Sequence, residues 1–169
     1  MSSIANIRLI ILGAFLIGIG CSSFFYLVFS FGQIPPQARI FDFWIPLVVL
    51  IFMTILIRAR KPGEPFHFWE GLISGNLMLW LGGLISGICI WLLTMYNATF
   101  FDTFISSSVR YLVESDRYAP PALKVKDLAA RVAEIKSTQP VSLIMDEAIK
   151  KVYYSFLLVP FVSMIFRRK

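Results

Sequence analysis

Long apolar segments are the feature of this sequence that most limits its fold. Four segments are long and apolar enough to cross a membrane as helices, at about 9–31, 40–57, 71–101 and 152–166. The hydrocarbon core of a bilayer is about 30 Å thick and takes roughly 20 helical residues to cross. The apolar residues run continuously and do not alternate with polar ones, which favours helices over barrel strands. We therefore predict an all-α polytopic membrane protein with four transmembrane helices in two antiparallel hairpins.

The composition excludes a soluble globular domain. Hydrophobic residues make up 57% of the 169 residues and charged residues only 15%, whereas soluble domains carry about 25% charged residues. A domain of this size cannot bury that much apolar surface within itself, so lipid must be the solvent for much of the chain. The chain contains sixteen Phe and four Trp, which also suits a membrane protein because aromatic residues favour the membrane interface.

The basic residues predict the orientation of the chain. One side of the predicted topology carries seven basic and two acidic residues, a net charge of +5, and the other side carries +1. The positive-inside rule then places both termini in the cytoplasm. We assign the same residues to anionic lipid headgroups, and not to nucleic acid. The basic residues that define this side at the ends of the second and fourth segments are Arg58, Arg60, Lys61, Arg167, Arg168 and Lys169.

The first apolar segment contains the sequence LIGIGCSS, which resembles a lipoprotein signal with Cys21 as the modified residue. Two features oppose cleavage there: Gly18 stands where a large aliphatic residue is expected, and the apolar run continues to Phe31. We therefore predict an uncleaved membrane anchor. Cys21 and Cys89 are expected to be buried packing residues, and not parts of a disulfide or a metal site.

The third segment repeats the pentapeptide GLISG within GLISGNLMLWLGGLISG, residues 71–87. At about 100° per residue, the small and polar residues of this stretch form two stripes about 100° apart, with bulky residues on the remaining side. Helices in lipid associate through small residues and hydrogen bonds, so we predict a packing face for each of two neighbours. Asn76 has two interpretations, an interhelical hydrogen bond or a contact to a substrate or ion. The predicted packing residues are Gly71, Gly75, Gly82 and Ser86 on one stripe, and Asn76, Gly83 and Gly87 on the other.

Residues 102–151 form the predicted extracytoplasmic insertion, which is too long for a plain loop and should contain amphipathic helices. The first of these is expected to continue the third apolar helix outward as far as the Pro120–Pro121 break. Charged residues of the insertion should lie just outside the membrane and pair with one another; an intramembrane proton relay is the alternative. The expected ion pairs are Asp127–Arg131, Asp146–Lys150 and Glu147–Lys151.

The overall plan resembles a family of small bacterial inner-membrane proteins known as domain of unknown function 4199. The resemblance rests on an aromatic and acidic entry to the glycine-rich third helix (FHFWEGLISG), an aromatic-acidic exit (FFDTF) and a final apolar helix that ends in MIFRRK. It implies four helices in a bacterial cytoplasmic (inner) membrane and brings no known activity, so no site residue is taken from it.

The sequence contains no pattern that indicates catalysis. It offers one histidine, His67, among interfacial aromatic residues, two isolated cysteines, and neither an H-E-x-x-H nor a G-x-S-x-G motif. We therefore predict a non-catalytic protein without cofactor or metal. Its predicted role is that of an accessory, assembly or interaction subunit, which binds membrane lipids and either further copies of itself or another membrane protein. A small transporter or channel component working as an oligomer is the alternative, and a membrane enzyme is the third possibility.

Overall fold

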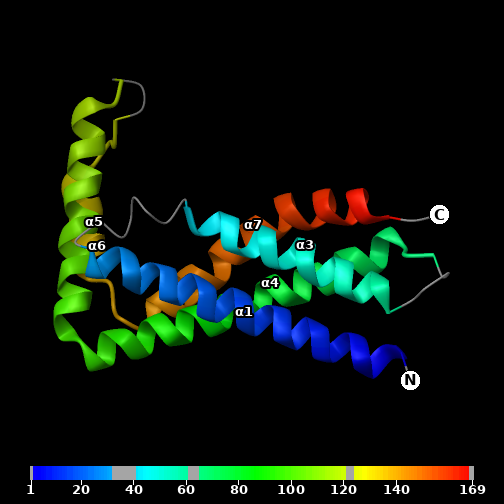
Figure 1. Cartoon of the computed structure of the whole chain (residues 1–169). Coiled ribbons are helices and arrows are strands. Elements are labelled where there is room, and N and C mark those ends of the chain that lie inside the picture. Colours follow the sequence, from blue (N-terminus) through cyan, green and yellow to red (C-terminus); the bar gives the residue numbers. More distant parts are fainter. Residues whose placement is uncertain (1, 32–40, 61–64, 121–123, 168–169) are drawn as a thin grey trace.

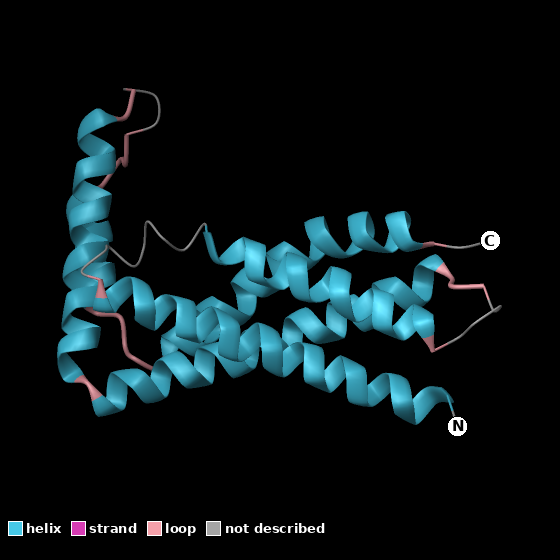
Figure 2. Ribbon diagram, in the orientation of Figure 1, coloured by secondary structure: helices cyan, strands magenta, loops and turns pink. Residues whose placement is uncertain are grey.

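The computed structural model describes residues 2–31, 41–60, 65–120 and 124–167, and the regular elements in this part of the chain are all helices, joined by loops and turns. The prediction of an all-α protein is confirmed. The described residues form six α-helices and one short 3-10 helix (Figures 1 and 2). These elements are α1 (Ser2–Ser30), η1 (Phe41–Phe43), α3 (Trp44–Ala59), α4 (Phe68–Tyr96), α5 (Ala98–Tyr118), α6 (Leu128–Lys136) and α7 (Ser142–Phe166).

Three helices are long and apolar enough to cross a membrane: α1 from Asn6, α4 and α7. The fourth apolar helix, α3, has 16 residues and a length of about 24 Å, which is shorter than a typical span. The chain therefore has the helices of a membrane protein. The second predicted segment, 40–57, is the one that falls short of full spanning length.

The apolar helices form one bundle in which α4 packs against both α1 and α7, and α3 packs against α1 and α7 (Figure 1). The start of α1 and the end of α7 lie at the same end of the bundle. An aliphatic cluster that includes Ile17, Leu50, Leu79 and Val159 fills the bundle towards this end. At the opposite end the core is aromatic, and its buried members are Phe25, Ile90, Phe100, Phe104 and Leu143.

The last helix, α7, begins at Ser142, and its whole length is apolar enough to be a candidate span, whereas the sequence analysis placed the start of the last membrane span near Val152. The earlier start follows from burial: Leu143, Glu147 and Lys151 all lie on the buried face of α7, in register with the apolar residues that follow. A helix of 25 residues rises about 37 Å, so the last segment is not the short span that its apolar residues alone predicted.

The third apolar helix is not continued outward, contrary to the prediction. It ends at Tyr96, and Asn97 adopts an extended conformation (φ −137°, ψ 91°) that turns the chain into α5. The Asn97 side chain accepts a hydrogen bond from the backbone N–H of Phe100 (3.2 Å) and so caps α5. As a result α5 runs crosswise over the end of the bundle (Figures 1 and 2).

We call α5 and α6 together the arm, residues 98–136. Its helices pack against each other, and Asp116 accepts a hydrogen bond from the N–H of Val125 (2.7 Å), which joins the two helices near the turn. Figure 1 shows that the far half of α5 projects past the side of the bundle. The arm therefore has a root on the bundle end and a free outer half.

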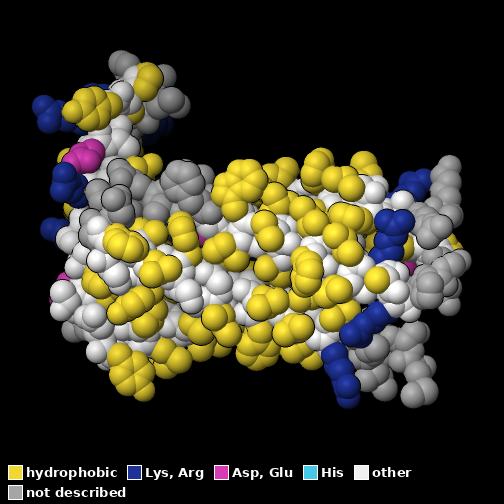
Figure 3. All heavy atoms as spheres, viewed as in Figure 1, with side chains coloured by type: hydrophobic (Ala, Val, Ile, Leu, Met, Phe, Trp, Pro, Cys, Tyr) yellow, Lys and Arg dark blue, Asp and Glu magenta, His cyan; other side chains and the backbone are white. Residues whose placement is uncertain are grey.

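The surface of the bundle is banded. Exposed hydrophobic side chains cover its flank, and Lys and Arg side chains gather at the end where both termini lie (Figure 3). Arg58 and Arg60 at the end of α3 and Arg167 after α7 belong to this end. Lys61, Arg168 and Lys169, which the sequence analysis assigned to the same set, lie outside the described residues.

Candidate functional site

The glycines of α4 face its two neighbours. A Cβ added at Gly71 or Gly75 would lie 2.6 Å from Ser163 Oγ or 2.7 Å from Val159 Cγ1, both on α7. A Cβ at Gly82 would lie 2.8 Å from Ile17 of α1. One straight stripe on α4 therefore meets α7 in its first half and α1 further along, as expected for helices that cross at an angle.

The second stripe faces α7. A Cβ at Gly87 would lie 2.7 Å from the backbone Cα of Ile144, and one at Gly83 would lie 2.9 Å from the Cβ and Cγ of Lys151. Gly83 thus provides the space in which the aliphatic stem of a charged residue enters the bundle.

The polar residues of the two stripes do not bond across helices in the described structure. Asn76 donates from Nδ2 to the carbonyl oxygen of Leu72 in its own helix (2.7 Å) and borders a groove of about 560 Å³ between α4 and α7. Ser86 is fully buried, and its Oγ is a polar side-chain atom without a partner in the described part of the chain. A side-chain hydrogen bond between α4 and α7 instead joins Trp80 Nε1 to Ser155 Oγ (3.2 Å).

An ion cluster lies inside the bundle and is the candidate functional site. Its centre is the carboxylate of Asp42 in η1. Asp42 Oδ2 accepts hydrogen bonds from Lys150 Nζ (2.7 Å) and Lys151 Nζ (2.8 Å), and Oδ1 accepts one from the hydroxyl of Tyr154 (2.9 Å). Three side chains of α7 therefore converge on one carboxylate at the start of α3.

Glu147 completes the ion cluster. Its carboxylate lies 2.6 Å from Lys150 Nζ and 3.8 Å from Lys151 Nζ. The side chains of Asp42, Glu147 and Lys151 are 4%, 1% and 0% exposed, and that of Lys150 is 18% exposed. Two carboxylates face two ammonium groups, so the ion cluster carries no net formal charge. Such compensation is required because an unpaired charge in an apolar interior costs several kcal/mol.

The ion cluster lies near the middle of the bundle, measured along the long axis of the bundle. Lys151 contacts Gly83, which is close to the midpoint of the 29-residue helix α4. Lys151 also precedes Phe166, the last residue of α7, by 15 positions, a rise of about 22 Å. When α4 and α7 cross a bilayer, both measures place Lys151 within the hydrocarbon core of about 30 Å. The structure thus buries these charges inside the bundle, and the expectation that they lie outside the membrane stays a prediction.

The expected ion pairs are also rearranged. Lys150 binds Asp42 and Glu147 in place of Asp146, and Glu147–Lys151 is the longest contact of the ion cluster. Sequence analysis missed the site, although one signal was present. Glu147, Lys151 and Ser155 recur every four residues in line with Leu143 and Val159, the spacing of a single helix face.

Chemically, the ion cluster can hold charge and tether helices. It joins η1, which directly precedes α3, to α7 through three charge-assisted hydrogen bonds, the strongest kind available to side chains. A fourth joins Lys150 to Glu147 within α7. Cys21 of α1 lies close enough to Lys151 to interact with it electrostatically. The partly exposed Lys150 is the member through which the ion cluster meets its surroundings.

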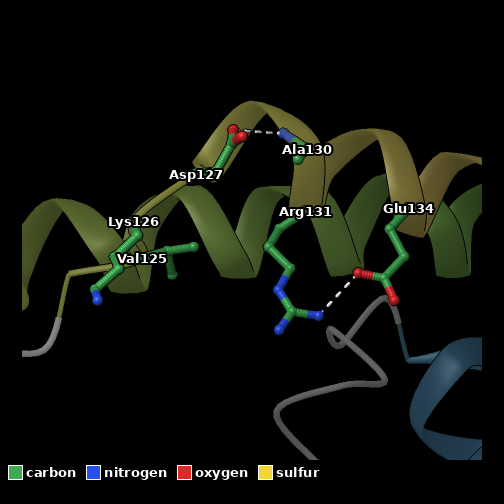
Figure 4. A pocket seen from close by; sticks show the side chains of 6 residues that line it. All are labelled: Val125, Lys126, Asp127, Ala130, Arg131 and Glu134. Carbon is green, nitrogen blue, oxygen red and sulfur yellow. Dashed lines mark hydrogen bonds and ion pairs between the residues drawn. The ribbon is translucent and has the colours of Figure 1, made fainter.

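The arm has a surface hollow of its own, about 530 Å³, at the start of α6 (Figure 4). The expected pair Asp127–Arg131 does not form. Asp127 instead caps α6 by accepting from the N–H of Ala130 (2.9 Å), and Arg131 pairs with Glu134 (2.8 Å). Because the acidic groups that line this hollow are already bonded within α6, the hollow does not rival the ion cluster as a site.

His67 lies at the other end of the bundle, where it precedes α4. Its backbone N–H donates to Glu70 Oε2 (3.2 Å), and the two residues form a reciprocal cap on the helix start. This arrangement gives His67 a structural role at the helix terminus.

Comparison with known proteins identifies the family of the chain but gives no activity. The model of a family described as "Protein of unknown function (DUF4199)" matches residues 12–168, nearly the whole chain. No curated protein and no solved structure matches the chain. The resemblance predicted from the aromatic, acidic and basic boundaries of the helices is confirmed. The chain belongs to the DUF4199 family.

Proposed function

We propose that this chain is a four-span integral protein of a bacterial cytoplasmic membrane that acts as a non-catalytic accessory or assembly subunit. Both termini and the Lys/Arg-rich end of the bundle face the cytoplasm, and the arm lies on the outer side. The partner is another integral membrane protein or a second copy of this chain. No cofactor is involved.

The observation that carries this proposal is a contrast between the bundle and the arm. The packing sites and charges inside the bundle are matched by other residues of the bundle, whereas the outer half of the arm is exposed. The eight glycines in the described part of the chain pack against its own helices, so these close-packing sites are used within the bundle. The four charges of the ion cluster compensate one another in the same way. The arm has no fully buried residue in α6 and projects past the bundle, which leaves it available for contacts.

Photo-crosslinking from the arm tests the proposal. A photoreactive residue at Ala133 or Lys136, both exposed on α6, is expected to give a discrete product in native membranes, which mass spectrometry then identifies as a membrane protein or a second copy. The matched control is Val48, exposed on the lipid-facing side of α3, where no discrete product is expected. A monodisperse monomer that gives no product from any arm position contradicts the proposal.

Proton- or ion-coupled transport is the second candidate, and the ion cluster is the observation that favours it. Ionisable residues inside membrane bundles are rare and often belong to ion or proton pathways. The discriminating variant is Asp42→Asn/Lys151→Met, which removes one charge of each sign. A transporter would lose its flux in liposomes with this variant. An accessory subunit would show no flux in either form and would keep its crosslinked product.

A further inference from the structure

The membrane-facing side of the arm can be identified from four aromatic residues of α5. At about 100° per residue, with Phe100 taken as zero, Phe104 lies at about 40°, Tyr111 at about 20° and Tyr118 at about 0°. They therefore form one stripe along the full length of the helix. We call it the aromatic stripe.

The first half of the aromatic stripe is buried against the bundle end. Phe100 lies 4.7 Å from Phe29 and 5.9 Å from Phe25 of α1, measured between ring centroids, and Phe104 lies 6.0 Å from Phe25. The side of α5 that carries the aromatic stripe therefore faces the bundle. It points along the long axis of the bundle.

In the described part of the chain, the second half of the aromatic stripe is exposed. Tyr118 is 14 residues beyond Phe104, about 21 Å along the helix, where α5 has passed the side of the bundle (Figure 1). Tyr111 is 41% exposed and Tyr118 is 81% exposed. Because α5 is one continuous helix, these two rings point in the same direction as Phe100 and Phe104.

We propose that Tyr111 and Tyr118 rest in the boundary between headgroups and acyl chains of the leaflet on the arm's side, and that α5 is an in-plane membrane anchor. This inference rests on the membrane orientation in the proposed function. When the bundle crosses the bilayer, a helix that lies crosswise on its end runs along the membrane surface. Its stripe side then faces lipid wherever the bundle is no longer beneath it.

Continuity with the aromatic residues of the bundle identifies lipid as the occupant. Tyr26, Phe31 and Tyr96 are exposed at the end of the bundle that carries the arm, at the level where a membrane interface would lie. Tyrosine suits this interface because its ring is apolar and its hydroxyl remains wet. The aromatic stripe extends this belt sideways.

The basic residues of α5 agree with an in-plane position, and Glu114, which lies nearer the stripe, is paired with Arg110 (2.8 Å). Arg110 and Arg117 lie about a quarter turn around the helix from the aromatic stripe. From there their guanidinium groups reach the lipid headgroups, while the aromatic stripe lies deeper, at the boundary with the acyl chains. Interfacial amphipathic helices have the same arrangement.

Collision-accessibility measurements on nitroxide labels test the inference. Single labels are placed at Tyr111→Cys, Tyr118→Cys and Val113→Cys in full-length protein with Cys21→Ala and Cys89→Ala, reconstituted in phosphatidylcholine vesicles. Val113 is the matched control because it is 42% exposed, like Tyr111, but lies about 200° away around the helix. Val48→Cys on α3, 63% exposed, reports on insertion of the bundle.

We expect the ratio of oxygen to water-soluble nickel-chelate collisions to be several-fold higher at positions 111 and 118 than at 113. A low ratio at 111 and 118, with a high ratio at 48, would overturn the inference and leave the inserted bundle intact. Shielding of 111 and 118 from both reagents would also overturn it, because a second copy then covers the stripe. A low ratio at position 48 as well would overturn the membrane orientation on which the inference rests.

Discussion

Lys151 shows how a charged side chain is accommodated in the apolar interior of the bundle. Its stem crosses α4 at Gly83, and its ammonium group reaches Asp42 at 2.8 Å, while the second carboxylate, Glu147, stays at 3.8 Å. Among the described residues, Asp42 is therefore its closest carboxylate partner. Removing one member of a buried ion pair leaves an uncompensated charge, which costs more than the pair contributes.

At the scale of the residue, we expect Asp42→Asn to destabilise the protein by about 3–5 kcal/mol, because Lys151 loses its close carboxylate partner. The double variant Asp42→Asn/Lys151→Met should recover most of this loss. It leaves Glu147 paired with Lys150 at 2.6 Å, and the asparagine oxygen still accepts from Tyr154. Unfolding in mixed detergent micelles measures both variants. A double variant as unstable as the single one would show that the network depends on both charges.

The individual contacts of the ion cluster were beyond sequence analysis for a physical reason. Asp42 and Lys150 are 108 residues apart, and no local rule links them. Side chains three and four residues apart can be paired from sequence, which is why Asp146–Lys150 and Glu147–Lys151 were expected. The four-residue recurrence of Glu147 and Lys151 with the apolar face of α7 was visible in the sequence and indicates burial.

At the scale of the element, the contact between α4 and α7 depends on which atoms fill the space above each glycine. At Gly87 these are backbone atoms of Ile144, at 2.7 and 2.8 Å, whereas at Gly75 they belong to the side chain of Val159. A side chain can adopt another rotamer, but a backbone can move only with its helix. The two glycines are therefore not equivalent, although both copies of GLISG contain one in the same place.

We expect Gly87→Ala to destabilise the bundle by about 1–3 kcal/mol, the usual cost of overpacking, and Gly75→Ala to cost less. Both variants gain the same helix propensity, about 1 kcal/mol, so their difference isolates packing. Thermal unfolding in detergent compares them. Equal midpoints would mean that α7 shifts as readily as the Val159 side chain.

The junction between α4 and α5 is the second element that can be tested. Asn97→Ala removes the cap on α5 and should cost about 1 kcal/mol, because the N–H of Phe100 loses its acceptor. Asn97→Asp, which retains the cap, is the control. Hydrogen exchange of the first turn of α5 should accelerate in the alanine variant only. Unchanged exchange would show that the aromatic contacts hold the turn without the cap.

Elements were predictable in proportion to how apolar they are. The long apolar runs in α1 and α4 were located from hydropathy, since lipid-exposed and buried faces are both apolar and no polar residue interrupts them. The break at Asn97 was not found, because FFDTF reads equally well as a continuing helix. The last apolar span was predicted to start only near Val152, because hydropathy assigns the charged residues Glu147 and Lys151 to the outside of the membrane, although both are buried in α7.

At the scale of the whole molecule, two polar regions are separated by an apolar flank. Lys and Arg side chains gather where α1 begins and α7 ends, and the arm lies at the opposite end (Figures 1 and 3). The extracytoplasmic insertion at residues 102–151 stays a prediction; the arm lies between α4 and α7 in the chain, and α7 begins within the predicted range.

We expect Ser137→Cys, just beyond α6, to react with a membrane-impermeant maleimide in intact spheroplasts, and Arg167→Cys to react only after the membrane is opened. Both positions are exposed, so membrane sidedness and not burial decides their labelling. The background carries Cys21→Ala and Cys89→Ala. The physical basis is the net charge of +5 at the end that holds the termini, since cationic residues are retained on the cytoplasmic side during insertion. Labelling in the reverse order would invert the topology and move the arm into the cytoplasm.

Replacing Arg58 and Arg60 with glutamine should weaken this orientation and increase labelling of Arg167→Cys in intact spheroplasts, because the remaining charge bias is smaller.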